Sequence, residues 1–213
     1  MFQLAAMSAE TPDPQLEVRA RRIIETTIEL AEQGGFEAVR LRDVAAHAEV
    51  AMGTLYRRFR SKEDLLVAAL EFETRAMAAR VEEKPPKGAT PSERVVGFFA
   101  IATRGMLRRP NLSRAMLRAS AAGEPVLAQK VEIFHDLMLR MTVGALRDVP
   151  IPARGEANFE DRERLLCEIL NQIWFAMMVG WSSGLQTLDS INERMRASVE
   201  LVLDQSHDTQ REI

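Results

Sequence analysis

Residues 41–59, LRDVAAHAEVAMGTLYRRF, decide how this chain is organised. The apolar residues of the first half fall at i, i+3, i+4 and i+7, which is one face of a helix: Leu41, Val44, Ala45 and Ala48. Residues 49–51 are long enough only for a turn. In the second half Leu55 and Phe59 stand one helical turn apart and face the same core. The stretch therefore predicts two short helices joined by a tight turn.

The second predicted helix leaves small, hydroxyl, aromatic and guanidinium side chains facing outward. These residues are Met52, Gly53, Thr54, Tyr56, Arg57 and Arg58. A helix pair at a steep angle with such a face suits insertion into a DNA major groove. Gly53 would allow close backbone approach, and Arg42 and Lys62 would hold phosphates or groove edges. The alternative, a surface hairpin with a solvated arginine pair, fits the same pattern, because short matches of this kind are common by accident.

The flanks of this stretch favour the DNA-binding interpretation. Ser61 is a suitable N-cap, Asp64 takes the capping-box position three residues later, and an apolar helix follows to about Val81. Upstream, a helix is predicted from Leu16 to about Gln33, where two glycines end it. The predicted hairpin therefore lies between two longer helices.

Four short runs in this region carry a resemblance to a known family. They are FEAV (36–39), RDVA (42–45), GTLYRRF (53–59) and SKE (61–63). Through them, residues 17–70 resemble the DNA-binding domain of the TetR family of bacterial transcriptional regulators. The resemblance implies a helix-turn-helix domain, a C-terminal helical ligand-binding and dimerisation domain, and a homodimer on a double-stranded DNA operator. The hairpin and the Trp174–Trp181 arrangement are also similar to actinobacterial repressors of sterol and lipid catabolism, which implies an acyl-CoA or steroid-like ligand.

The composition of the chain limits the size of its core, the kind of partner it can bind and its redox environment. The chain has 213 residues, of which 46% are hydrophobic, enough for one sizeable core or two small ones. Its net charge of −3 is unusual for a DNA binder, so basic charge must be concentrated locally. Basic residues do cluster near the hairpin: Arg19, Arg21, Arg22, Arg40, Arg42, Arg57, Arg58, Arg60 and Lys62. A single cysteine, Cys167, excludes an intrachain disulfide and fits the cytoplasm.

Breaker residues divide the chain into three parts. We expect a disordered arm over residues 1–16, the helix-turn-helix domain over 17–82, and a helical ligand-binding and dimerisation domain over 83–213. The linker EEKPPKG (82–88) marks the boundary, and Thr90, Pro91 and Glu93 then start a capped helix. Further helices are predicted from Asn111 as a cap, at 126–146, at 159–184 and at 190–205. The predicted fold is all-α with about nine helices and, because no apolar run is long enough, no membrane span.

Methionine and aromatic residues beyond the linker could line an apolar pocket, since methionine adapts to irregular ligands. The candidates are Phe98, Phe99, Met138, Trp174, Met178 and Trp181, with Asn171, Gln172 or Arg104 orienting a polar end. We expect an apolar small-molecule effector there. The competing interpretation of each apolar residue is ordinary core packing.

The helix around Trp174 is apolar on nearly every side, so it must be buried on more than one face. The last helix offers a second apolar stripe: Ile191, Met195, Val199, Val202 and Leu203. Two such helices from each of two subunits would form a four-helix dimer interface. On this hypothesis, glutamate at Val199 or Leu203 yields monomers. The alternative is that both faces are used within one monomer.

Several kinds of chemistry lack the necessary residues. The three histidines, His47, His135 and His207, lie far apart without ligand spacing, so no metal site is expected. The sequence contains no glycine-rich phosphate loop and no serine elbow. We therefore expect neither an enzyme nor a cofactor. The remaining alternative is a helical carrier of lipids or an interaction protein, which would give no salt-sensitive, sequence-specific gel shift.

Overall fold

The computed structural model describes residues 14–155 and 160–208, and all regular structure in these ranges is helical. The elements in chain order are α1 (Pro14–Ala38), α2 (Leu41–His47), α3 (Met52–Arg58), α4 (Lys62–Glu83), α5 (Pro91–Leu107), α6 (Pro110–Ala121), the 3-10 turn η1 (Pro125–Leu127), α7 (Ala128–Arg147), α8 (Asp161–Ser182) and α9 (Leu188–Asp208). The predicted all-α fold is confirmed. Of the predicted arm over residues 1–16, residues 1–13 lie outside the described ranges, whereas residues 14–16 already belong to α1.

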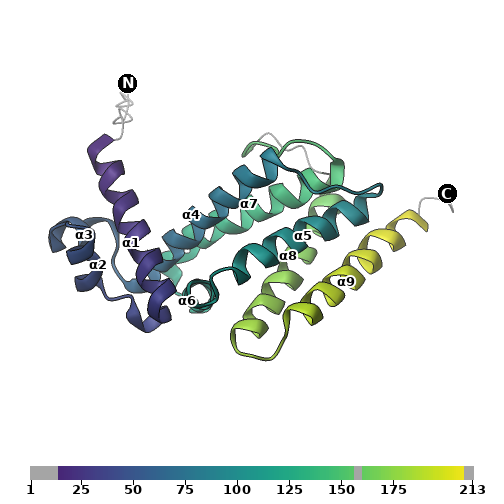
Figure 1. The fold of residues 1–213 in the computed structure, drawn as a ribbon. Helices are drawn as coiled ribbons and strands as arrows, with labels where there is room; N and C mark the ends of the chain where they lie inside the picture. The colour runs from purple at the N-terminus through teal and green to yellow at the C-terminus, as the bar shows by residue number, and fades with distance from the viewer. Residues whose placement is uncertain (1–13, 156–159, 209–213) are drawn as a thin grey trace, which may run out of the picture.

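Helices α1, α2 and α3 form one end of the molecule (Figure 1). Helix α1 breaks at Gly34 and Gly35, where Gly35 takes a positive φ of 66° that a side chain would disfavour. One more helical turn follows this break, and α2 begins shortly after it. Leu55 and Phe59 are buried beneath α3, as their spacing predicts. The two-helix hairpin is therefore present with the predicted inward face.

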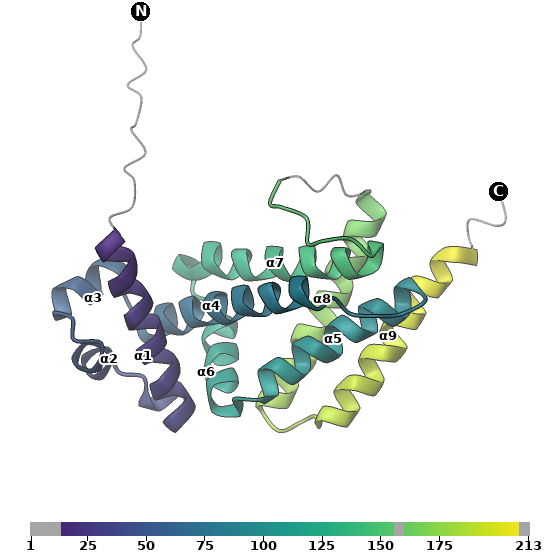
Figure 2. The ribbon, with the colours of Figure 1, turned by 45° about the horizontal axis from the view of Figure 1, so that its top comes forward.

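Helix α4 runs from this end into the body formed by α5–α9, where it lies beside α7 (Figures 1 and 2). Helix α6 packs along α1, so the body contacts the hairpin end through two helices. One continuous apolar core runs from Ile23 in α1 to Leu203 in α9. The two ends of the chain are thus coupled by shared packing.

Side-chain caps start α4 and α5 where the sequence predicts them. Ser61 accepts a hydrogen bond from Asp64 N at 3.1 Å, and Thr90 and Glu93 form a capping box at the start of α5. The predicted cap at Asn111 is wrong, because α6 begins at Pro110. The Asn111 amide instead donates to Glu32 O of α1 at 3.1 Å and ties α6 to the hairpin end.

The predicted dimer stripe on the last helix is also wrong. Ile191, Met195, Val199 and Leu203 are buried within the monomer, and Val199 is 0% exposed. Helix α9 packs against both α5 and α8, so its strongest apolar face is covered by its own chain. The sequence correctly indicated an apolar stripe on α9, but it did not show that α5 and α8 of the same chain would cover that stripe.

Candidate DNA-binding and ligand-binding sites

Helix α3 presents the predicted DNA-contacting face to solvent. Tyr56 is 54% exposed, and Arg42, Gly53, Arg57 and Arg58 are also exposed. Met52, Thr54 and Lys62 are half-buried, and Met52 packs against the core. A Cβ atom at Gly53 would meet nothing within 4 Å, so this protein leaves open space in front of the helix backbone. An aromatic and two guanidinium groups on an exposed helix are suited to reading a major groove.

The cations near α3 already have acceptors in the free protein. Arg58 Nη2 lies 3.0 Å from Glu17 Oε1 in α1, and Lys62 Nζ lies 3.3 Å from Glu37 Oε2. Arg57 Nη2 donates to Thr54 Oγ1 at 3.3 Å on its own helix. A phosphate contact by Arg58 or Lys62 therefore exchanges a carboxylate for a phosphate, which lowers its net gain.

Phe36 connects Lys62 to the body of the molecule. Lys62 Nζ and Arg118 Cζ each lie 3.9 Å from the centroid of the Phe36 ring, and Arg118 Nη1 donates to Glu37 Oε1 at 3.0 Å. The Lys62 hydrogen bond and charge, followed by those of Arg118, lower the pKa of the Glu37 carboxyl. This cluster joins α1, α4 and α6 and includes Lys62, one of the predicted DNA contacts.

Arg19 belongs with the predicted face although the spacing did not single it out. It lines a hollow of about 160 Å³ together with Thr54, Arg57 and Arg58. The hollow lies between α1 and α3, whose residues are distant in sequence. In the sequence, only the local excess of basic residues around Arg19 indicated that it belongs to this face.

A buried ion pair fixes α4 to the start of α7. The Asp64 side chain is 7% exposed, accepts from Arg60 N at 3.0 Å and is paired with Lys130 Nζ. Lys130 also lies 5.3 Å from the centroid of the Phe59 ring, at the end of α3. Helix α7 therefore holds the exit of α3 through one lysine.

The eight residues predicted to bind ligand occupy different environments. Phe98, Phe99, Met138 and Met178 are fully buried core residues, whereas Arg104 is exposed. Trp174 is buried and donates from Nε1 to Thr103 Oγ1 at 2.9 Å. Trp181 is packed beneath Arg114. Asn171 lines a polar hollow, which is described below.

Trp174 borders a narrow cleft between α4 and the α5–α6 pair. Its volume is about 40 Å³, and its apolar lining also includes Met77, Met106, Met116 and Phe134. Polar residues on the same cleft are Glu73, Thr74, Arg80, Arg109 and Ser113. The cleft contains apolar groups and charges of both signs, but it is too small in this state for a drug-sized ligand.

Asn171 lines a polar hollow of about 350 Å³ between α7 and α8. Its Nδ2 donates to Thr142 Oγ1 at 3.0 Å and to Cys167 O at 2.8 Å, while its buried Oδ1 has no protein partner among the described residues. Burial lowers the pKa of His135 in this hollow and raises the pKa of the Cys167 thiol to about 12. Cys167 is therefore an unreactive, protonated thiol near neutral pH.

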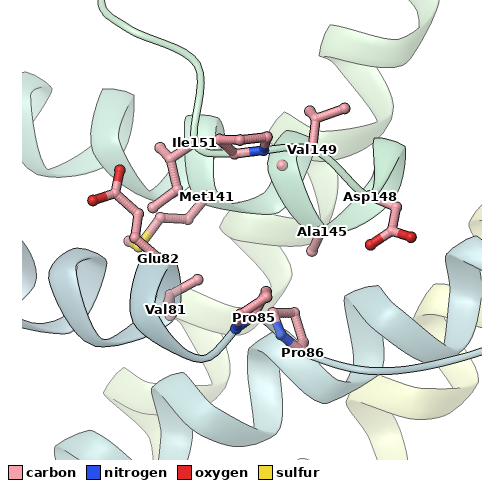
Figure 3. Close-up of a pocket in the computed structure, with 11 residues that line it drawn as sticks. Val81, Glu82, Pro85, Pro86, Met141, Ala145, Asp148, Val149 and Ile151 are labelled. Carbon is pink, nitrogen blue, oxygen red and sulfur yellow. The ribbon is translucent and has the colours of Figure 1, made fainter.

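An apolar cavity of about 310 Å³ lies where α4 and α7 both end. Val81 and the two prolines after α4 form one wall, and Met141, Ala145 and Ile151 form the other (Figure 3). Helical spacing in the sequence did not indicate this cavity. The only available signal was a pair of proline-rich loops, 85–86 and 150–152, which the fold brings together.

Two further observations concern metal sites and membrane-spanning helices among the described residues. Within residues 14–155 and 160–208, no group of three or more histidine, cysteine, aspartate or glutamate side chains is placed to hold a metal ion. By length and mean hydropathy of 1.2, α8 is the one described helix that could cross a membrane, which the sequence had not suggested. Its buried residues pack against α6, α7 and α9.

The comparisons with known proteins agree with this architecture. Residues 23–69 match the family of bacterial regulatory proteins named tetR, and residues 88–202 match the tetracyclin repressor-like C-terminal domain. The HTH-type transcriptional repressor KstR of Rhodococcus jostii is 35% identical over 87% of this chain and 82% of its own length. The KstR repressor of Mycobacterium tuberculosis is 32% identical over 87% of this chain and 80% of its own length.

Solved structures extend the agreement to the fold. A TetR transcriptional regulator from Rhodococcus sp. RHA1 has a TM-score of 0.77 at 27% identity, covering 90% of this chain and 97% of its own. FadR from Bacillus subtilis in complex with stearoyl-CoA has a TM-score of 0.59 at 19% identity, covering 86% and 97%, and shares the fold. Regulators of this family are typically cytoplasmic and dimeric, and they are transcription factors rather than enzymes. The chain belongs to the TetR family and is a ligand-responsive, DNA-binding transcriptional repressor.

Proposed function

We propose that this protein acts as a homodimer on a partly palindromic operator, and that an apolar small molecule releases it. The single observation that carries the DNA part is the exposed α3 face, with Tyr56, Arg57 and Arg58 above a buried Leu55. A dimer would place two such helices in successive major grooves about 34–36 Å apart. Arg42, Gly53, Thr54 and Lys62 complete the proposed contact set.

The proposed dimer surface is the outward side of α8 and α9, opposite the stripe that the monomer buries. On α8, Leu165, Ile169, Ile173 and Ala176 follow helical spacing and are exposed or half-buried. On α9, Leu201 is 62% exposed, one turn beyond exposed Ala197. Apolar side chains on two adjacent helices are typical of a homodimer interface. They also explain why α8 is more apolar than its own chain requires.

The proposed effector site is the cleft beside Trp174. At about 40 Å³ it holds no more than a small occupant, so a drug-sized ligand must separate α4 from α5 and α6. Helix α4 carries the hairpin end, and its displacement would change the spacing of the two α3 helices in a dimer. Arg80 on the cleft suits an anionic head group, in keeping with the proposed lipid or steroid acyl-CoA effector, whereas Arg109 is paired with Glu73 and Glu32. Of the apolar residues predicted to bind ligand, Trp174 remains a proposed ligand contact. The others form the core that supports the cleft: Phe98, Phe99, Met138, Met178 and Trp181.

Replacing Arg57 or Arg58 with alanine is expected to weaken operator binding by about 1–3 kcal/mol and to relax base preference, because each guanidinium would lose a base contact. Tyr56→Ala tests the same helix through its aromatic face. Titration of labelled operator and of base-substituted variants measures both effects. Arg75→Ala, an exposed arginine on α4 away from α3, is the matched control and should leave affinity unchanged. Unchanged binding in all three α3 variants would show that α3 does not read the operator.

Effector and operator are expected to oppose each other by the same factor. The coupling should be about 1–3 kcal/mol, roughly 5–150-fold, because each ligand favours a different position of α4. Mass spectrometry of molecules that co-purify with the protein identifies the effector, and it is then titrated with and without operator. Equal effector affinity in the two titrations would remove the switch, even if the cleft binds the molecule.

A further inference from the structure

We infer that the cavity between the ends of α4 and α7 is a separate binding site for an amphipathic ammonium compound, an apolar chain or ring that carries one positive charge. The cavity is already open at about 310 Å³, whereas the cleft beside Trp174 is nearly closed. The site therefore needs no separation of helices before it is filled. Its existence depends on neither the proposed operator nor the proposed effector.

The body of the cavity selects for an apolar occupant. Val81, Pro86, Met141 and Ala145 are buried residues that contribute to its walls, and half-buried Ile151 covers one side (Figure 3). None of them brings a side-chain hydrogen-bond donor. Transfer of an alkyl chain from water to these walls is favourable at roughly 25 cal/mol per Å² of buried apolar surface.

Gly144 makes the roof of the cavity possible. A Cβ atom at this position would lie 3.1 Å from Val149 O and 3.5 Å from the Ile151 Cα. Glycine therefore lets residues 149–151 lie directly against α7. Val149 N donates to Gly144 O at 3.1 Å, and Arg140 holds the far side of the loop by donating to Pro152 O at 3.0 Å. These two hydrogen bonds therefore hold the loop that forms the roof of the cavity in place.

The charged groups at the edge of the cavity select a cation. Glu82 and Asp148 are the charged side chains among the lining residues, both are exposed, and Figure 3 shows them at opposite edges. Helices α4 and α7 both end here, and helix C-termini favour positive charge. An anionic ligand would meet a like charge at either edge, whereas an ammonium group would meet a carboxylate at whichever edge it reaches.

Arg94 of α5, which contacts the end of α7, does not reverse this preference. Arg94 donates to Ala145 O at 3.0 Å, to Leu146 O at 2.9 Å and to Gly88 O at 3.3 Å. Its guanidinium is therefore committed to backbone carbonyls, and it is not among the lining residues. This site therefore differs from the Trp174 cleft, whose lining includes the cationic residues Arg80 and Arg109.

Three probes with one octyl chain and different heads test the inference on the full-length protein by calorimetry: octylammonium, 1-octanol and octanoate. Octylammonium should bind once per chain and at least about tenfold more tightly than octanoate, with 1-octanol between them. Glu82→Gln and Asp148→Asn should each weaken octylammonium several-fold and leave 1-octanol unchanged. Glu83→Gln, beside the cavity but not on it, is the matched control. Octanoate binding as tightly as octylammonium would overturn the inference.

A filling variant tests the location. Ala145→Met should abolish binding of octylammonium while leaving the circular-dichroism melt cooperative, because its longer side chain occupies the cavity. Retained binding in the folded variant would overturn the assignment. If Ala145→Met does not fold, the double variant Glu82→Gln/Asp148→Asn decides the matter, since both positions are exposed and asparagine tolerates the positive φ of 58° at residue 148. Unchanged octylammonium affinity in that double variant would equally rule the site out.

Discussion

Replacing Leu201 or Leu165 with glutamate is expected to give folded monomers that no longer hold the operator tightly. Both side chains are exposed in the monomer, at 62% and 55%, so a charge there does not enter the core of the chain. In a symmetric dimer each substitution places two charges in one apolar interface, at a cost of at least about 3 kcal/mol and more than a hundredfold in dimer dissociation. Operator affinity falls with dimerisation because the second hairpin no longer binds intramolecularly.

Sedimentation analysis over a range of concentrations measures the effect, and operator titration is done on the same samples. Val126→Glu is the matched control, since Val126 is 59% exposed at η1, away from α8 and α9, and should leave the dimer intact. Val199→Glu should behave differently and lower the melting temperature, because Val199 is fully buried. Dimeric Leu165→Glu and Leu201→Glu proteins would show that the partner binds elsewhere.

Replacing Lys130 with methionine is expected to destabilise the protein by about 3 kcal/mol, because it leaves the Asp64 carboxylate buried without its cation. Lys130 is 33% exposed and Asp64 only 7%, so water compensates the carboxylate poorly. Urea unfolding at one fixed protein concentration measures the free energy of unfolding. Operator affinity should fall as well, since Lys130 holds the exit of α3 through Asp64 and Phe59.

Two further variants test whether the loss of stability is specific to the buried Asp64–Lys130 pair or common to any ion pair. Arg75→Met removes the exposed Arg75–Glu71 pair on the same α4 helix, with Arg75 66% exposed, and should cost less than about 0.5 kcal/mol. Adding Asp64→Asn to Lys130→Met should restore part of the stability, because asparagine can still accept from Arg60 N without leaving a buried charge. Equal destabilisation by Lys130→Met and Arg75→Met would refute a special role for this pair.

The sequence by itself determined the features that depend on neighbours along the chain. Leu55 and Phe59 at helical spacing specify which side of α3 is buried, and therefore that Tyr56, Arg57 and Arg58 face outward. The helix breaks at Gly34–Gly35 and the Thr90 capping box follow from backbone freedom and local hydrogen bonds. Such signals act within one or two helical turns, so they can be recognised without the rest of the fold.

Only the tertiary structure decided which apolar face meets which helix. Val199 and Leu203 look like interface residues in sequence, yet α5 returns to cover them. Arg19 joins Arg57 in one hollow, and Lys130 reaches Asp64, although these residues lie far apart in the chain. The cavity between α4 and α7 likewise depends on two loops meeting. A helical stripe specifies that a surface must be buried, but apolar attraction has no direction, so the partner is chosen by the packing of the whole chain.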